Sequence, residues 1–146
     1  MTLGTLRILL AAVATREKEK RFKIVKEKQG IAEADLQVQS ELSDDEIVET
    51  ISSEIKKRRD AIVLYNQGKR PELAEREESE IKVLQRYLPE QLSQDEIRQL
   101  AAESIERLGA KEIKDMGKVM ADLNPKVKGR AEGSQVSKII KELLLK

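Results

Sequence analysis

The sequence predicts an all-helical (all-α) protein, with a long N-terminal helical hairpin or three-helix layer over residues 1–88 and a compact C-terminal three-helix bundle over residues 93–146. Runs of Glu, Lys, Leu, Ala and Arg, which favour helices, are punctuated by three prolines and seven glycines in 146 residues. Aromatic residues are limited to Phe22, Tyr65 and Tyr87. Strands would need aromatic and β-branched residues in alternation, a pattern that the chain does not have.

A first helix is expected at the N-terminus. Thr2 or Thr5 can cap its start, and Gly30 is a stop signal at its end. Its apolar positions follow 3-4-3 spacing, which predicts one buried face: Leu3, Leu6, Leu10 and Val13. The stretch 31–42 is polar and weakly patterned, so it is interpreted as a connector.

Two further helices are expected in the N-terminal part. Ser43 and Glu46 have the spacing of a capping box, in which each side chain bonds the other residue's backbone amide. Gly68 ends this helix, Pro71 fits the first turn of the next one, and Pro89 prevents helical geometry in the residue before it. The two helices carry apolar residues at helical spacing: Ile47, Ile51, Ile55, Ile62, Ala74, Ile81, Leu84 and Leu88.

The C-terminal part repeats the same signals. Ser93 and Glu96 form a second capping box, and Gly109 suits the residue after a helix. A short helix is expected over residues 115–123, stopped by Asn124 and Pro125. A loop over 126–133 leads to the last helix. The apolar positions of the three helices are Ile97, Leu100, Ala101, Ile105, Leu108, Met116, Val119, Met120, Leu123, Val136, Ile139, Ile140, Leu143 and Leu144.

The composition excludes several kinds of chemistry. The chain has no Cys and no His, which removes thiol nucleophiles, imidazole bases and the commonest zinc ligands. The densest acidic cluster, Glu75, Glu77, Glu78 and Glu80, is interpreted as a solvated helix face rather than a metal site. No Gly-rich phosphate loop occurs. We therefore expect no active site and no cofactor.

The apolar run over residues 6–14 raises the question of a targeting segment. It lacks a basic region before it, Arg7 lies inside it, and it is too short to span a bilayer. We therefore expect no signal peptide, no membrane association and a cytoplasmic location.

Charge is distributed unevenly along the chain. Residues 1–30 carry eight Lys/Arg and three acidic residues (net +5), residues 31–110 carry eleven and nineteen (net −8), and residues 111–146 carry nine and five (net +4). Basic ends around an acidic middle suit a nucleic-acid partner, although solvated helix faces would give the same pattern. The four consecutive cations at 56–59 spread around a helix, so they are interpreted as solvated charges paired with neighbouring acids.

The most informative segment lies around the last two predicted helix starts. A helix N-terminus flanked by Lys and Arg is a ready phosphate site, and glycines there allow close backbone approach. The alternative is a solvated connector whose glycines serve only the turn. The predicted nucleic-acid-binding residues are Lys118, Lys126, Lys128, Arg130 and Lys138. No aromatic residue lies nearby to stack on bases, which favours reading the backbone and shape of a folded RNA.

These motifs resemble those of the YqeY family (the GatB/YqeY group). The most specific segments are residues 115–120 and 125–133, and residues 5–12, 54–62 and 87–93 add to them. The C-terminal third is also similar to the tail domain of the GatB subunit of the aspartyl/glutamyl-tRNA amidotransferase.

The resemblance implies an accessory tRNA-binding protein. A tail of this kind approaches the outside of tRNA, and similar domains are attached to some glutaminyl-tRNA synthetases. The family also carries an amidotransferase-type label (carbon–nitrogen ligase activity with glutamine as amido-N-donor), which is inherited from the complex and which no residues here support. The predicted partners are tRNA, and an aminoacyl-tRNA synthetase or amidotransferase subunit. No DNA partner is expected.

The alternative to tRNA binding is a helical protein-interaction module that docks a synthetase or amidotransferase. An exposed strip of Leu or Ile on the first helix would favour it. Two departures from the family pattern bear on the fold. Family members usually have an additional amphipathic stretch before the segment that begins at Thr5, which leaves the packing partner of the first helix open. Glu132 stands at the cap of the last helix, where Asp or Asn is common, and Glu is a poorer cap.

Overall fold

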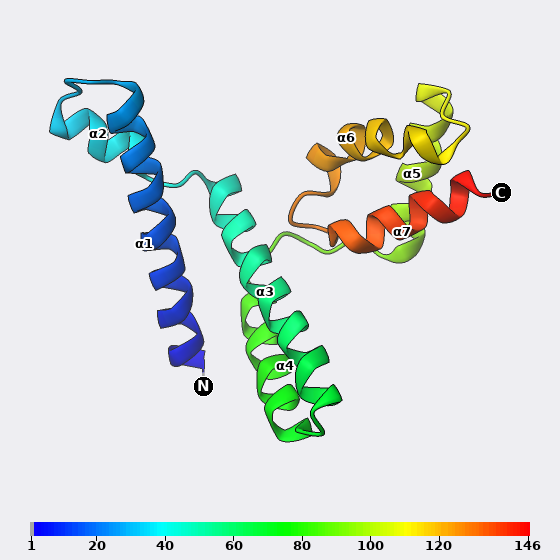
Figure 1. Ribbon diagram of the computed structural model, residues 1–146, viewed down its shortest axis with the longest axis horizontal. Helices are drawn as coiled ribbons and strands as arrows, with labels where there is room; N and C mark the ends of the chain where they lie inside the picture. The colour runs from blue at the N-terminus through cyan, green and yellow to red at the C-terminus, as the bar shows by residue number, and fades with distance from the viewer. Residues whose placement is uncertain (1) are drawn as a thin grey trace. The chain divides into compact units, whose positions relative to one another are not determined.

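The computed structural model describes residues 2–146 and divides into two compact units, Met1–Tyr87 (unit 1) and Leu88–Lys146 (unit 2). Every regular element in the described residues is a helix (Figure 1), which confirms the all-α prediction. None of these helices is both long and apolar enough to cross a membrane.

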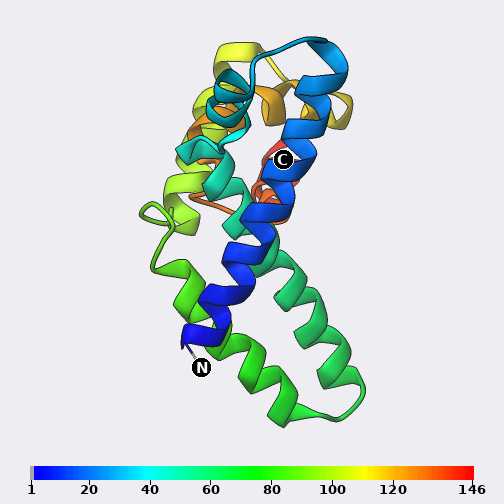
Figure 2. The ribbon, with the colours of Figure 1, turned by 90° about the vertical axis from the view of Figure 1, so that its left-hand side faces the viewer.

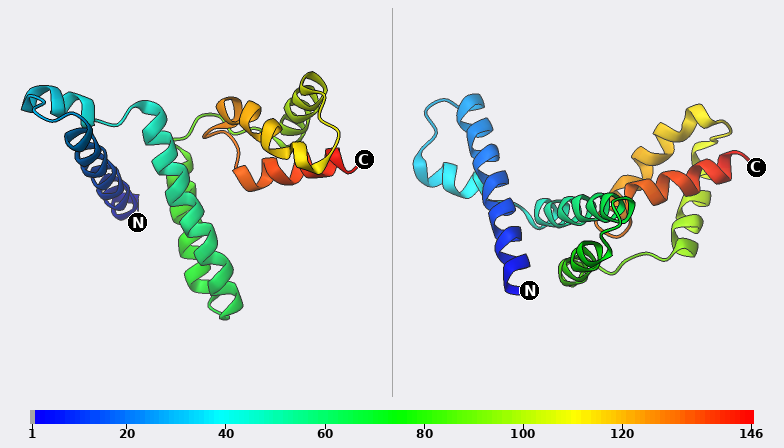
Figure 3. Two further views of the ribbon diagram at one scale, coloured as in Figure 1. Left: turned by 45° about the horizontal axis from the view of Figure 1, so that its top comes forward. Right: turned by 60° about the horizontal axis from the view of Figure 1, so that its bottom comes forward.

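Unit 1 is built from four helices: α1 (Thr2–Glu27), α2 (Glu33–Ser40), α3 (Asp44–Gln67) and α4 (Pro71–Gln85). Helices α3 and α4 form a hairpin and pack against each other along their length (Figure 3). Helix α1 packs against α3, α4 and α2. The buried apolar residues come from all four helices: Leu9, Leu36, Ile51, Ile55, Ala74, Ile81, Val83 and Leu84.

The helix α2 was not predicted, and the interpretation of residues 31–42 as a connector is wrong. Leu36 and Ser40 lie four residues apart, on one side of α2, and both are buried. The start of this helix has Ala32 at its N-cap, with no side-chain capping bond. The helix therefore depends on its packing against α1 rather than on local signals that a sequence would reveal.

The predicted apolar face of α1 is wrong for two of its four residues, since Leu6 and Val13 are half-buried but the other two are exposed. Leu3 and Leu10 are 62% and 66% exposed, whereas Thr5 and Leu9 are buried. Apolar residues occupy adjacent positions in this segment, so their spacing fits more than one face of the helix. Packing within unit 1 selects the face that carries Thr5 and Leu9.

A buried guanidinium joins α3 to α4. Within α3, Arg58 Nη1 donates to Glu54 Oε2 and to the Glu54 carbonyl, both at 3.1 Å. Its Nε donates to Glu80 Oε2 of α4 at 3.0 Å and lies 3.9 Å from Glu77 Oε2. The Arg58 side chain is 8% exposed. The interpretation of the cations at 56–59 as solvated is therefore wrong for Arg58, because three carboxylates from two helices surround it.

The same ion cluster corrects the interpretation of the acidic residues of α4. Glu75 and Glu78 are exposed as expected, but Glu77 and Glu80 turn toward Arg58. Burial acts to raise the pKa of Glu54, but hydrogen bonds from Lys57 and Arg58 outweigh it and lower that pKa below its ordinary value. All three carboxylates therefore serve the hairpin rather than a metal ion.

The start of α3 is tied to α1 by a second acidic group. The predicted capping box is present, with Ser43 N donating to Glu46 Oε2 at 2.7 Å and Glu46 N donating to Ser43 Oγ at 3.3 Å. Lys20 Nζ of α1 donates to the same Glu46 oxygen at 2.8 Å. Hydrogen bonds from Lys20, which has the largest effect, and from the Ser43 amide lower the pKa of Glu46 from 4.5 to about 2.

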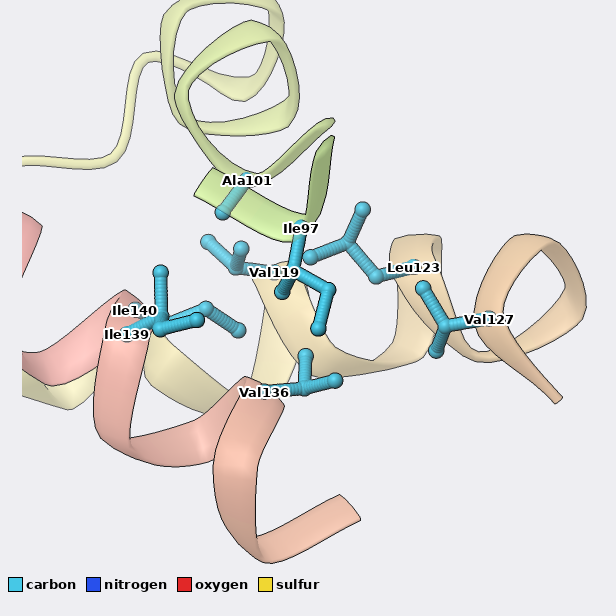
Figure 4. Packing of buried hydrophobic residues seen from close by; sticks show 8 residues of the cluster. All are labelled: Ile97, Ala101, Val119, Leu123, Val127, Val136, Ile139 and Ile140. Carbon is cyan, nitrogen blue, oxygen red and sulfur yellow. The ribbon is translucent and has the colours of Figure 1, made fainter. Parts of the chain in front are cut away.

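Unit 2 contains the helices α5 (Gln94–Leu108), α6 (Met116–Val127) and α7 (Gly133–Leu144), with a 3₁₀ turn η1 (Ile113–Asp115) before α6. The second predicted capping box, Ser93 with Glu96, is present, and Gly109 ends α5 in the left-handed conformation (φ 65°). One apolar cluster fills the space between the three helices (Figure 4): Ile97, Ala101, Val119, Leu123, Val127, Val136, Ile139 and Ile140.

Pro125 does not stop α6, contrary to the prediction. It lies inside the helix, which continues to Val127. A proline removes one amide donor and crowds the carbonyl four residues earlier. Here that loss falls in the last turn of the helix, and Val127 is buried in the core of unit 2. Packing of Val127 therefore extends the helix past the proline.

Replacing Arg58 with alanine should lower the free energy of unfolding by about 3 kcal/mol, because Glu54 and Glu80 would remain buried without their common partner. Urea denaturation followed by circular dichroism measures this change. Lys56→Ala is the matched control, since Lys56 is an exposed cation of the same helix. Equal effects of the two substitutions would contradict the role assigned to the buried cluster.

The Glu46 carboxylate should make stability depend on acidity. Because its pKa is lowered on folding, its contribution is fully present above about pH 4.5 and is lost as the pH falls toward 2. Glu46→Gln keeps the shape of the capping box but should flatten the pH dependence of the unfolding free energy in this window. Glu78→Gln, an exposed position of α4, should leave the dependence unchanged. If the unfolding free energies of E46Q and the parent protein changed with pH in the same way, the role assigned to the Glu46 carboxylate would be refuted.

Candidate nucleic-acid interface

The connector between α6 and α7, residues 128–132, begins with a tight turn. Gly129 has a φ of 72°, a conformation that glycine adopts without steric cost. The amides of Arg130 and Ala131 both donate to the Val127 carbonyl, at 2.8 and 3.0 Å. The turn therefore closes the end of α6 and fixes the direction in which the connector leaves it.

A distant segment holds the connector in place. Gln91 Nε2 donates to the Gly129 carbonyl at 2.8 Å, and the Leu92 amide donates to the Arg130 carbonyl at 2.8 Å. In return, Arg130 Nε donates to the Glu90 carbonyl at 3.2 Å. We call this set of three hydrogen bonds the clasp. Because the bonds tie both Gly129 and Arg130 to residues 90–92, the connector has a defined shape rather than that of a loose turn.

The clasp brings two helix starts to the same place. Helix α5 begins two residues after Leu92, and α7 begins three residues after Arg130. The start of α5 already holds the Glu96 carboxylate, whose pKa is lowered by hydrogen bonds from the Ser93 amide and hydroxyl and by the nearby Arg130. Glu132 occupies the N-cap of α7 and makes no capping bond with its side chain, as expected for a poor cap.

Three of the five predicted residues meet at the connector. Lys126 and Lys128 are exposed at the end of α6, and Arg130 is half-buried in the clasp. Lys138 is exposed in the second turn of α7. Lys118 is exposed near the start of α6, eight residues before Lys126, which corresponds to about 12 Å of helix. The five residues therefore do not form one tight cluster: Lys118 lies toward the far end of α6.

Carboxylates lie close to two of the lysines. Asp122 accepts a hydrogen bond from Ser104 Oγ at 2.7 Å and another from Arg107, and these contacts lower its pKa, with a smaller effect from Lys126. Asp115 accepts hydrogen bonds from the amides of Lys111 and Glu112. These bonds lower the pKa of Asp115, and the charge of Lys118 adds to the effect. The positive charge of Lys118 and Lys126 is therefore partly offset by these neighbours.

The clasp was not predicted from the sequence. Residues 87–93 contribute to the family resemblance, but their pattern predicts no role for Gln91. An exposed glutamine two positions after a proline gives no signal of a partner 38 positions away. Among the described residues, no group of three or more acidic side chains is placed to hold a metal ion. What this end of unit 2 offers chemically is a positively charged, fixed backbone turn beside a helix N-terminus.

Replacing Gln91 with alanine should loosen the connector. The substitution removes the bond to the Gly129 carbonyl and should lower the free energy of unfolding by about 0.5–1 kcal/mol, because the bond is exposed to solvent. Amide hydrogen exchange should be faster over residues 128–131. Gln94→Ala, at an exposed position in the first turn of α5, is the control. Unchanged exchange in Q91A would contradict the clasp.

The comparisons with known proteins agree with the motif analysis. The family model described as Yqey-like protein matches residues 8–144, nearly the whole chain, and thus includes the clasp, the connector and all five predicted binding residues. A comparison with curated proteins gives no match. The match over both units confirms the suspected resemblance, and the chain belongs to the Yqey-like protein family.

Proposed function

We propose that the protein is an accessory tRNA-binding protein, and that unit 2 contacts tRNA phosphates through the α6–α7 connector. The single observation that supports this best is the clasp. It fixes Gly129 and Arg130, which lie between the end of α6, with Lys126 and Lys128, and the start of α7. A preorganised cationic turn loses less conformational entropy on binding than a mobile one.

Electrostatics favour a polyanion at this end of unit 2. The peptide dipoles of α7 place a partial positive charge at Gly133. The Glu132 side chain makes no capping hydrogen bond to this helix start. Residues 111–146 have a net charge of +4. Phosphate groups bind well where free backbone amides and cationic side chains coincide. Arg130 has two roles. Its guanidinium adds positive charge to the turn, and its Nε donates to the Glu90 carbonyl and so helps to fix the shape of the turn.

The chemistry of the site favours a folded RNA over other nucleic acids. All three aromatic residues of the chain precede residue 88, so unit 2 has no ring on which an unpaired base can stack. Exposed lysines and a backbone turn read phosphate positions and shape. We propose tRNA in particular because the motifs of the C-terminal third resemble those of the GatB tail. The chain has no His or Cys that would support an amidotransferase reaction.

A protein-docking role for unit 1 is the second candidate function, with a synthetase or amidotransferase subunit as the proposed partner. The observation in its favour is the set of exposed apolar residues on α1: Leu3, Ile8, Leu10, Phe22 and Val25. This role does not compete with tRNA binding, because the two would use different units.

The tRNA proposal is tested by titrating the protein into labelled tRNA at several salt concentrations. Lys126→Gln and Lys128→Gln should each weaken binding and reduce the slope of log affinity against log salt by roughly one unit, because each removes one phosphate contact. Lys118→Gln should have a smaller effect, since Lys118 is remote from the connector. Lys138→Gln should weaken binding, whereas Lys141→Gln, on the same helix, should not.

Duplex DNA of equal length serves as the competitor and should displace tRNA poorly. Absence of binding at low salt would reject the direct RNA role. If all the lysine variants, including K141Q, lost the same affinity, binding would depend on overall charge, and the connector would not be the site.

A further inference from the structure

One row of side chains runs along the exposed side of α1. Its members are spaced three or four residues apart, so they share one side of the helix. All seven are exposed, and the row extends over about 33 Å. We call it the outer row: Leu3, Arg7, Leu10, Ala14, Lys18, Phe22 and Val25. It faces away from the buried residues Thr5 and Leu9.

The outer row is strongly apolar for an exposed surface. Leu3, Leu10 and Phe22 are 62%, 66% and 70% exposed, so much of their apolar area remains in contact with water. Figure 2 shows α1 in front of the α3–α4 hairpin, with no other helix of unit 1 in front of it. Burying such side chains against a partner is favourable, because it removes apolar surface from water. Exposed apolar surface of this length is typical of an interaction site.

The charges within the row indicate the chemistry of the partner. Arg7 and Lys18 alternate with the apolar residues, and the row contains no carboxylate. Neither cation makes a hydrogen bond or an ion pair with another described residue. A partner that covers the row would bury both cations, which is costly unless it supplies negative charge. The partner therefore needs apolar side chains with acidic groups between them.

Three other occupants fit this pattern less well. A second copy that presents its own outer row brings two more cations and no carboxylate. In a membrane-surface helix the cations lie on the polar face, whereas Arg7 and Lys18 lie within the apolar row. Phosphates of an RNA could pair with the cations but would not cover the apolar side chains of Leu3, Leu10 and Val25. An amphipathic helix whose carboxylates fall between its leucines or isoleucines matches both features.

We propose that the outer row of α1 docks an acidic amphipathic helix of another protein. The helix would lie along α1, with apolar side chains against Leu3, Leu10 and Phe22 and with carboxylates against Arg7 and Lys18. When two helices pack together, opposite charges beside their apolar contact fix both the register and the choice of partner. This inference rests on the second candidate function and is independent of tRNA binding by unit 2.

The test places a photoreactive amino acid at position 10, in the cells in which the protein is normally made, and identifies the cross-linked peptide by mass spectrometry. The matched control is position 64, because Leu64 is also 66% exposed in unit 1 but lies on α3. Position 10 should cross-link to a peptide of another protein that is acidic and has apolar residues at helical spacing. Arg7→Glu should reduce the yield at least fivefold, whereas Lys56→Glu should not.

Cross-links from position 10 to another copy of this chain, to RNA, to lipid or to a peptide without acidic residues would overturn the proposal. A cross-link to another protein from position 64 alone would retain a protein-docking function but reject the outer row. No cross-link from either position would reject both. Titration of the R7E variant with tRNA keeps the two functions separate, since its affinity should match that of the parent protein.

Discussion

The connector between α6 and α7 has its shape because a distant segment is hydrogen-bonded to it. Gln91 and the Leu92 amide bond to Gly129 and Arg130, and Arg130 bonds back to Glu90. Without these contacts, the connector would lose its ties to residues 90–92 and keep the hydrogen bonds from the Arg130 and Ala131 amides to the Val127 carbonyl. The clasp also determines that α5 and α7 begin near each other, so that one end of unit 2 combines a helix N-terminus with exposed lysines.

Local signals were sufficient for much of the fold. The two capping boxes, the proline at the start of α4 and the glycine after α5 were predicted, because each acts through neighbouring backbone groups. The core of unit 2 was predicted as well, apart from Val127, since its three helices have clear apolar spacing. Errors occurred where tertiary packing outweighs local preference. Leu36 stabilises a helix without a capped start, and Val127 extends α6 past Pro125.

Interactions between distant residues limited what could be predicted about the site. The sequence located the basic connector, but it gave no indication that Gln91 holds it, since that bond joins positions far apart in the chain. Arg58 illustrates the same limit in unit 1. Its neighbours along the chain suggest a solvated cation, whereas Glu80 of the adjacent helix makes it a buried one. The outer row of α1 became visible only when the structure showed that Thr5 and Leu9, rather than Leu3 and Leu10, are buried.

The most direct test of the central claim is a nuclear magnetic resonance titration of the ¹⁵N-labelled protein with tRNA. If the clasped connector is the phosphate site, the largest amide shifts should fall on residues 126–136, with the amides in the first turn of α7 among them and with α1 unaffected. Shifts confined to unit 1, or small shifts spread evenly over both units, would contradict the account.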